Sequence, residues 1–490
     1  GRTLMVMGTG SGVGKSLLTA ALCRIFTQEG LSVAPYKSQN MSNNAHVCAD
    51  GGEISRAQAL QAAACRLEPT VDMNPILLKP GSDTGAQVIV RGRPLRSMKA
   101  KEYQDYRHHL IPQLKECLTR LRQEHDLVVI EGAGSPAEIN LRDTDIVNMK
   151  TAEIAGAPVI LVGDIDFGGV FAQLVGTMEL LTAEERKRVK GLVINKFRGD
   201  LDILKPGIEF LEQKTGLPVL GVVPFLKGLQ LPEEDTPAPF TSKAAGERIR
   251  IDVVRLPRMA NFTDFDALGR EHDVELRYVE RPDDRVPDAL IIPGTKSTMA
   301  DLRHLKENGL ASHIISLSQR NIPVVGICGG YQILGRRVLD PQGVESDRRE
   351  EEGLGLLPCK TTFSPKKETA QVTAVHVETG EPIEGYEIHM GRTEVEGDGI
   401  FHIKTRAGVF DGHPDGASAG EGRIWGTYIH GVFDARGFRR HFINQLRSAR
   451  GWAPDRGSED TDLHAELDKL ALHVRSSLDM KTIRRFVETC

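Results

Sequence analysis

The segment GTGSGVGKS, Gly8 to Ser16, decides the fold of this chain. It directly follows the apolar run Thr3–Met7, which predicts a strand, and it opens the helical pattern Ser16–Glu29. Glycines let backbone N–H groups approach phosphate oxygens, and the N-terminus of the following helix adds positive potential. A strand, a glycine-rich loop and a helix in this order predict a nucleotide-phosphate site on a parallel α/β sheet.

Two side chains of this loop carry the predicted chemistry. Lys15 is expected to reach the terminal phosphates, and the Ser16 hydroxyl to bind Mg²⁺. Five residues rather than four separate Gly8 from Gly14. This spacing resembles the dethiobiotin-synthetase-like branch of phosphate-loop proteins, and the resemblance implies ATP and Mg²⁺ as cofactors. The predicted nucleotide-binding residues are Gly8, Thr9, Gly10, Ser11, Gly12, Val13, Gly14, Lys15, Ser16, Lys37 and Asn195.

A magnesium–triphosphate site also needs carboxylates at strand ends. Glu131 follows the apolar strand Leu127–Ile130, so it is expected at the carboxyl edge of the sheet, where ligands bind. The resemblance implies that Glu131 is a metal ligand. Asp50 and Glu53 lie in DGGEISRAQ, and either could supply a further ligand. The predicted metal set is Ser16, Asp50 and Glu131.

Two polar residues complete the predicted edge. Lys37 comes just after the second strand and could neutralise a transferring phosphoryl group or bind a substrate carboxylate. Asn195 follows the strand Gly191–Ile194, and by resemblance it could hydrogen-bond adenine.

Alternating apolar runs and helical patterns predict the fold class, which is α/β with two parallel-sheet domains. Strands of the first domain are expected at Thr3–Met7, Ser32–Tyr36, Leu127–Ile130, Pro158–Val162, Gly191–Ile194 and Val219–Val223. Its helices are expected at Ser16–Glu29, Ile54–Leu67, Tyr103–Glu124 and Val170–Leu181. Strands of the second domain are expected at Ile251–Arg255, Val274–Val279, Ala289–Ile292, Pro323–Ile327 and Ile424–Ile429.

The alternation breaks at a stretch rich in Pro, acidic and small residues, LPEEDTPAPFTSKAAG, which predicts a linker. We therefore expect a phosphate-loop domain over residues 1–232 and a linker over 233–248. The second domain is expected over 249–490, and it includes the helical C-terminal segment.

A second active-site pattern lies in the second domain. The apolar strand Ile322–Ile327 leads into Gly326-Ile327-Cys328-Gly329-Gly330 and then into a helical segment. This is the strand–nucleophile–helix turn of G-x-[S/C]-x-G, in which glycines allow a sharp turn and the helix N-terminus favours the thiolate. Cys328 is the predicted nucleophile. The alternative interpretation, a buried structural cysteine without a catalytic role, fits this context poorly.

A nucleophilic thiol needs a base, and His430 in GTYIHGVFD ends the predicted strand Ile424–Ile429. Cys328 and His430 together resemble the class I, triad-type glutamine amidotransferase domains. Those domains usually carry an acid two residues after the histidine, where this chain has Val432. The third member stays open between Glu387, Asp434 and a Cys-His dyad.

Composition excludes other classes of protein. The 490 residues carry a net charge of -5, which argues against a nucleic-acid binder. Seven scattered cysteines without a CxxC pair predict reduced thiols in a cytoplasmic protein. No apolar run approaches the roughly 18 residues of a membrane span, so no membrane association is expected. The sequence leaves a homo-oligomer open.

Several long motifs resemble the cobyric acid synthase family, and they are distributed over essentially the whole chain. They are YKSQNMSNN (36–44), EGAGSPAEINLRDTDIVNM (131–149), DIDFGGVFA (164–172), INKFRGD (194–200), LPRMANFTDFDAL (256–268), PGTKSTMADL (293–302) and GYEIHMGRT (385–393).

The resemblance implies an ATP- and glutamine-dependent ligase of cobalamin biosynthesis. It would amidate the b, d, e and g carboxylates of adenosylcobyrinic acid a,c-diamide through acyl phosphates, giving adenosylcobyric acid. Cobalt would then belong to the corrinoid substrate. Two alternatives remain: cobyrinic acid a,c-diamide synthase, and a phosphate-loop regulatory ATPase with a non-catalytic amidotransferase domain.

Overall fold

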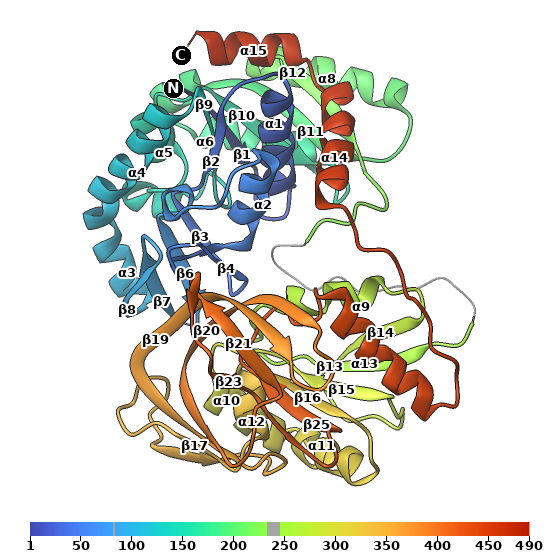
Figure 1. Ribbon diagram of the computed structural model, residues 1–490. Helices are drawn as coiled ribbons and strands as arrows, with labels where there is room; N and C mark the ends of the chain where they lie inside the picture. The colour runs from blue at the N-terminus through green and yellow to red at the C-terminus, as the bar shows by residue number, and fades with distance from the viewer. Residues whose placement is uncertain (82–83, 233–245, 490) are drawn as a thin grey trace.

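The computed structural model describes residues 1–81, 84–232 and 246–489. Two α/β units lie one above the other in Figure 1, and the chain crosses back to the first unit near its end. The α/β fold class and its two parallel sheets are confirmed. The predicted linker, residues 233–248, lies outside the described residues over 233–245.

The first unit is built on a six-stranded parallel sheet with the order β12-β11-β10-β1-β9-β2. Leu4 and Val6 face one apolar core, whereas Met5 and Met7 face another. Because both faces of the sheet are covered, its strands are near-continuous apolar runs. The strands are β1 (Arg2–Gly8), β2 (Val33–Tyr36), β9 (Leu127–Glu131), β10 (Val159–Asp164), β11 (Val189–Phe197) and β12 (Val219–Pro224). The helices around it include α1 (Lys15–Gln28), α2 (Arg56–Ala64), α4 (Ile111–Glu124), α5 (Met149–Ala155), α6 (Val170–Leu180), α7 (Ala183–Arg188) and α8 (Leu201–Thr215).

Two of the expected helices are shorter than predicted. The helix expected at Ile54–Leu67 begins at Arg56, because Glu53–Ser55 pairs as a strand and the Ser55 hydroxyl caps the helix. The helix expected at Tyr103–Glu124 is divided by a 3-10 turn, Arg107–Leu110, before α4 begins with a proline in its first turn.

Between β2 and β9 the chain forms two small sheets that project toward the second unit (Figure 1). The larger one has the order β3-β6-β7-β8 and carries the helix α3 (Ala100–Tyr106). Their strands are β3 (Gln39–Met41), β4 (Ala45–Val47), β5 (Glu53–Ser55), β6 (Ile76–Pro80), β7 (Gly85–Val90) and β8 (Arg93–Lys99).

The second unit contains a sheet of order β14-β13-β15-β16-β25-β24, in which only β24 is antiparallel. Its strands are β13 (Ile249–Val254), β14 (Val274–Val279), β15 (Ala289–Ile292), β16 (Val324–Ile327), β24 (Ala417–Ala419) and β25 (Ile424–Thr427). Its helices are α9 (Asp266–Arg270), α10 (Thr298–Glu307), α11 (Leu310–Gln319), α12 (Gly329–Leu334) and α13 (Arg436–Ala449).

A mostly antiparallel sheet, in which β17 pairs with β19 in parallel, is inserted between β16 and β24 and faces the small sheets of the first unit (Figure 1). Its strands are β17 (Arg337–Leu339), β18 (Glu350–Glu352), β19 (Cys359–His376), β20 (Pro382–Val395), β21 (Phe401–Arg406), β22 (Val409–Phe410) and β23 (Pro414–Asp415). Its two long strands, β19 and β20, form most of its area.

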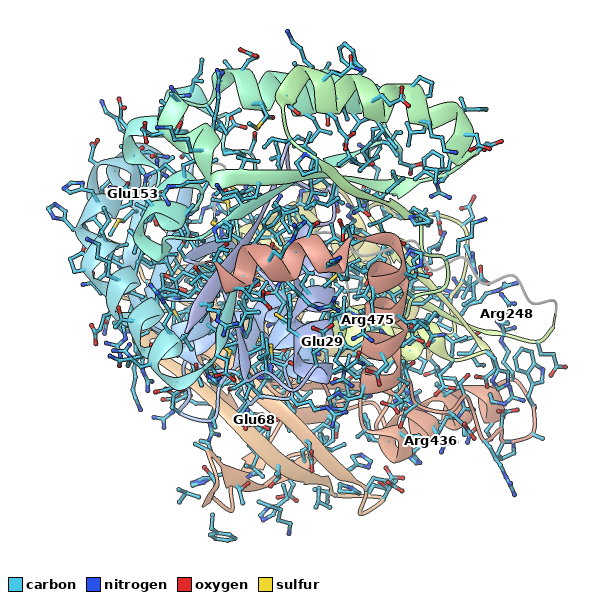
Figure 2. All side chains as sticks on the ribbon, turned by 90° about the horizontal axis from the view of Figure 1, so that it is seen from above. Glu29, Glu68, Glu153, Arg248, Arg436 and Arg475 are labelled. Carbon is cyan, nitrogen blue, oxygen red and sulfur yellow. The ribbon has the colours of Figure 1, made fainter. Side chains whose placement is uncertain are left out.

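The C-terminal helices were expected in the second domain, but they pack on the first unit. Leu467 and Ile483, from α14 (Leu463–Ser477) and α15 (Met480–Glu488), are fully buried in the apolar core around α1. Arg24 of α1 also pairs with Asp468 at 2.7 Å. Figure 2 shows these helices beside α1, with Glu29 and Arg475 labelled near the contact. An amphipathic pattern gives the face that a helix buries, but not its partner.

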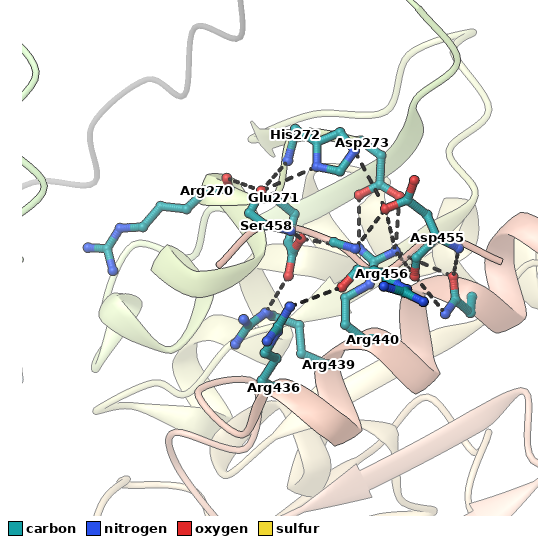
Figure 3. A network of polar contacts seen from close by, with 12 residues as sticks. Arg270, Glu271, His272, Asp273, Arg436, Arg439, Arg440, Asp455, Arg456 and Ser458 are labelled. Atoms are coloured by element: carbon teal, nitrogen blue, oxygen red, sulfur yellow. Dashed lines mark hydrogen bonds and ion pairs between the residues drawn. The ribbon is translucent and has the colours of Figure 1, made fainter. Parts of the chain in front are cut away.

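The segment 450–462, which joins α13 to α14, is held on the second unit by a polar network that includes buried ion pairs of α13 (Figure 3). The Ser458 N–H donates to Glu271 at 2.7 Å, and Arg440 of α13 donates to the Asp455 carbonyl at 3.0 Å. Arg439 donates to Glu271 at 2.7 Å, and Arg440 to Asp273 at 2.9 Å. With His272, these carboxylates form a group that could hold a cation, but their oxygens already pair with guanidinium groups. We therefore interpret the group as an anchor for this segment. No helix in the described parts of the chain has the length and apolarity to cross a membrane.

Packing of α14 on α1 generates a stability prediction. Leu467→Ala should lower the free energy of unfolding by about 2–5 kcal/mol, because Leu467 is fully buried and a cavity would replace it. Leu472→Ala, on the same helix, should change it by less than about 0.5 kcal/mol, because Leu472 is 67% exposed. Denaturant unfolding of the full chain measures both, and equal effects would contradict the packing.

Candidate functional site

The phosphate loop connects β1 to α1, as predicted. Gly12 and Gly14 have φ angles of 73° and 96°, which only glycine adopts at little cost. A Cβ atom on Gly14 would also lie 2.2 Å from the Asn195 amide nitrogen. Lys15 donates to the carbonyls of Gly10 and Gly134 at 2.7 and 3.2 Å, so its ammonium lies over the loop.

Glu131 is the centre of a buried polar cluster at the carboxyl end of β9. Its Oε1 accepts from the Ser16 hydroxyl and from the Lys37 ammonium, each at 2.8 Å. Its Oε2 accepts from Gln61 and, at 3.4 Å, from Gln58, both on α2. The structure thus brings together three residues predicted from separate motifs: Ser16, Lys37 and Glu131. A hydroxyl and a carboxylate beside a phosphate loop are hard oxygen donors of the kind that Mg²⁺ prefers.

Asp50, which the sequence offered as a metal ligand, lies outside this cluster in the structure. It is exposed in the turn between β4 and β5, where its carboxylate accepts from the Gly52 N–H at 2.9 Å. Glu53, the other candidate, is fully buried and paired with Lys79 and Lys367. Burial by itself would raise the pKa of Glu53, but Lys367 and Lys79 outweigh it and lower that pKa to about 2.

Asn195 supports the phosphate loop from the neighbouring strand. Its amide donates to the Val13 carbonyl at 2.8 Å, and Lys196 donates to the Gly12 carbonyl at 2.6 Å. Lys196 also pairs with Asp164 at the end of β10. The structure therefore places Asn195 at the phosphate end of the site, and no described contact assigns it to a base.

A cavity of about 840 Å³ extends from this cluster. It is lined by Lys15, Lys37 and Glu131 at one end and by the loop 223–232 at the other. Leu470, His473 and Val474 of α14 also line it, a contribution that no sequence pattern indicates.

Cys328 lies in a sharp turn between β16 and α12, as predicted. Its φ of 51° is rare for a residue with a side chain and indicates strain. A Cβ atom on Gly330 would lie 2.0 Å from the Ile292 carbonyl oxygen, and one on Gly326 would lie 2.7 Å from Gly330. Both glycines are needed because β15, β16 and α12 approach each other too closely for any side chain.

His430 lies beside Cys328 and is oriented by Asp264, a residue that the sequence analysis did not select. His430 Nδ1 hydrogen-bonds Asp264 Oδ2 at 2.7 Å, and the other oxygen accepts from the Gly431 N–H at 3.0 Å. Burial lowers the pKa of His430, but the Asp264 carboxylate and Cys328 outweigh it and raise that pKa to about 10. A protonated imidazole next to the thiol favours the thiolate, which is the nucleophilic form.

The two earlier candidates for the orienting acid take no part in this contact. Glu387 pairs with Arg406 on β21. Asp434 lies beyond Gly431, where burial raises its pKa to about 6. Asp264 could have been noticed as one of the acids in the quoted motif LPRMANFTDFDAL, which follows the first strand of the second domain. Its distance of 166 residues from His430 hid the contact.

Asn261 links His430 to the first unit. Its Nδ2 lies 3.2 Å from His430 Nε2, and its Oδ1 accepts from the Ala45 N–H at 3.0 Å. A second hydrogen bond joins the units in the opposite direction, because Asn44 Oδ1 accepts from the Phe262 N–H at 3.0 Å. All of these groups are buried, so the loop that holds the histidine is docked directly onto the first unit.

Cys328 and His430 open into a second cavity, of about 420 Å³. Both units line it: β8 and Lys79 come from the first, whereas Lys296, Glu345 and Lys367 come from the second. The described residues therefore form two separate cavities, one at a phosphate loop and one at a cysteine–histidine–aspartate group.

Comparison with known proteins agrees with this division. The nucleotide-binding domain of the CobQ/CobB/MinD/ParA type matches residues 4–238, and the CobB/CobQ-like glutamine amidotransferase domain matches residues 250–438. The cobyric acid synthase of Dehalococcoides mccartyi (strain CBDB1) is 50% identical over 495 aligned residues, covering 98% of both chains. Those of Desulforamulus reducens and Clostridium acetobutylicum are 48% and 49% identical, over 99% and 98% of this chain and 98% and 97% of their own.

The chain belongs to the cobyric acid synthase family. Members of this family are glutamine-dependent amidating ligases of cobalamin biosynthesis, so the resemblance noted in the sequence is confirmed at the level of the family. The matches to these relatives span both units.

Asp264 generates the prediction for this site. Asp264→Asn should lower the rate of glutamate release from glutamine by about 10²- to 10⁴-fold, because His430 loses the group that sets its tautomer and orientation. Losing the carboxylate should also lower the pKa of His430, so Cys328 should be alkylated by iodoacetamide more slowly near pH 7. Glu387→Gln, which removes the acid suggested by sequence, serves as the control. A larger loss with Glu387→Gln than with Asp264→Asn would contradict the assignment.

Proposed function

We propose that this chain converts adenosylcobyrinic acid a,c-diamide into adenosylcobyric acid by amidating the b, d, e and g carboxylates, with ATP as the energy source and glutamine as the nitrogen donor. The observation that carries the proposal is the presence of both active-site constellations, Ser16–Lys37–Glu131 and Cys328–His430–Asp264, in buried sites of one chain. Hydrolysing glutamine without an acceptor would only waste it.

In the first cavity, Lys15 and the N-terminus of α1 would bind the ATP phosphates. Ser16 and Glu131 would hold Mg²⁺, which neutralises phosphate charge when it is bound. Lys37 and Ser16 both donate to the same oxygen of Glu131, so Lys37 lies close to the expected metal site. From there it would stabilise the γ-phosphoryl group as this group moves to a corrinoid carboxylate. The product of this step is an acyl phosphate and ADP.

In the second cavity, the Cys328 thiolate would attack the carboxamide carbon of glutamine. His430 would give its proton to the departing ammonia, leaving a thioester on Cys328. His430 would then take a proton from water, which hydrolyses the thioester to glutamate. Backbone N–H groups after Cys328 and the Gly294 segment, next to both Cys328 and His430, would stabilise the oxyanion. Ammonia finally displaces phosphate from the acyl phosphate and forms the amide.

A direct assay tests the substrate assignment. The chain is incubated with ATP, Mg²⁺, glutamine and the corrinoid a,c-diamide, and mass spectrometry counts the carboxylate-to-amide steps. We expect four steps. Two steps on the unamidated corrinoid acid would identify an a,c-diamide synthase instead, and none on either corrinoid would refute the proposal.

A cysteine substitution tests the division of labour. Cys328→Ala should lose glutamine-dependent amidation but keep amidation with high ammonium, because the nucleotide cavity is untouched. Cys359→Ala, which replaces another buried cysteine of the second unit, should retain both activities. Undiminished glutamate release by Cys328→Ala would refute the thiol mechanism.

A further inference from the structure

The cavity at Cys328 has one charged wall that the thiol chemistry does not use. Lys79 and Lys367 share a single carboxylate, Glu53, at the contact between the two units. Lys296 and Glu345 line the same cavity. Three ammonium groups and one carboxylate thus line a volume of about 420 Å³, and Glu53 pairs with two of these ammonium groups without lining the cavity.

Lys296 differs from the other two lysines of this wall. Within residues 1–81, 84–232 and 246–489, its ammonium has no hydrogen bond and no ion pair, although it lines a half-enclosed cavity. Its backbone is firmly held, because the Lys296 N–H donates to the Arg258 carbonyl at 2.9 Å. A fixed lysine with an unpaired head group next to a nucleophile has the properties of a ligand-binding group.

Glu345 faces the same space with the opposite charge. One carboxylate oxygen accepts from the Met299 N–H at 2.9 Å. The other oxygen has no partner among the described residues. Burial lowers the pKa of Lys296 and raises the pKa of Glu345 to about 7. The attraction between Lys296 and Glu345 offsets part of this burial cost, and a ligand with a charge of opposite sign beside each group would offset more.

Resting on the glutaminase activity proposed above, we propose that Lys296 binds the α-carboxylate of glutamine and Glu345 binds its α-ammonium group, which places the carboxamide at Cys328. Glutamine is a zwitterion at its α-carbon and neutral at the carboxamide. The cavity has the complementary arrangement, with one charged side chain of each sign at its wall and the Cys328–His430 pair beside them.

The proposal also explains why the first unit contributes to this cavity. The Lys79–Glu53–Lys367 ion triad is almost completely buried between the units, and burial lowers the pKa of Lys367 to about 7. When Lys367 is protonated, the triad carries one net positive charge near Lys296. That field favours a carboxylate in the cavity. Glutamine binding would therefore depend on the docking of the two units as well as on the amidotransferase fold.

Substrate analogues that lack one charged group test the proposal. Ammonia release is measured with L-glutamine, with 4-aminobutanamide, which lacks the α-carboxylate, and with glutaramic acid, which lacks the α-amino group. Lys296→Met should lower kcat/KM for glutamine by about 10- to 100-fold, mainly through KM, because a charge-assisted hydrogen bond is lost. The same variant should change kcat/KM for 4-aminobutanamide by less than about twofold.

Glu345→Gln should show the converse pattern, with a loss on glutamine and little change on glutaramic acid. Lys366→Met is the matched control, because Lys366 is next to Lys367 in sequence but exposed and paired with Glu368. It should leave all three substrates unchanged. If Lys296→Met does not fold, Lys296→Gln is used in its place. Amidation supported by ammonium shows whether the nucleotide-binding unit of each variant is folded.

Two results would overturn the assignment. A variant that loses as much kcat/KM on its truncated analogue as on glutamine would show that the substituted residue acts on the thiol or on the fold. A changed pH profile of Cys328 alkylation in that variant would show that the effect is on the thiol. The proposal would also be refuted if both variants kept the ratio of kcat/KM for glutamine to kcat/KM for the truncated analogues unchanged. These outcomes differ from failure of the proposed function, in which the unmodified chain would release no ammonia from glutamine in a Cys328-dependent way.

Discussion

The docking of residues 43–45 onto residues 261–262 is the contact on which both cavities depend. It exchanges two buried hydrogen bonds between the units, Ala45 N–H to Asn261 and Phe262 N–H to Asn44. On one side, Asn261 contacts the imidazole of His430. On the other, the Asn44 carbonyl accepts from the N–H of Arg56, the first residue of α2. A buried polar contact of this kind is costly to leave unpaired, so it defines one relative position of the two units.

Helix α2 carries that contact to the nucleotide cavity. Gln58 and Gln61, one helical turn apart, both donate to the Glu131 carboxylate. A continuous series of buried polar groups thus runs from the histidine of one site to the carboxylate of the other. These contacts align the two sites with each other within the described parts of the chain.

The returning C-terminal segment reinforces the same arrangement. Arg439 and Arg440 of α13 hold it on the second unit through Asp460 and the Asp455 carbonyl. It then leads into α14, whose side chains close the nucleotide cavity. The order of elements along the chain is therefore not the order of the units in space. Helices α14 and α15 follow the amidotransferase domain in sequence but complete the nucleotide-binding one.

Local rules determined much of this protein from sequence alone. All six strands of the first parallel sheet, the phosphate loop and the cysteine turn were predicted, because each depends on hydrophobic periodicity or on glycine spacing within a few residues. Glu131 was located by the rule that strand ends share one edge of a sheet. Asp264, Gln58, the partners of Glu53 and the docking of α14 were decided only by tertiary structure. Each depends on contacts between segments far apart in the chain. A sequence pattern indicates which helix face must be buried or which charge must be paired, but it does not identify the residues that bury or pair it.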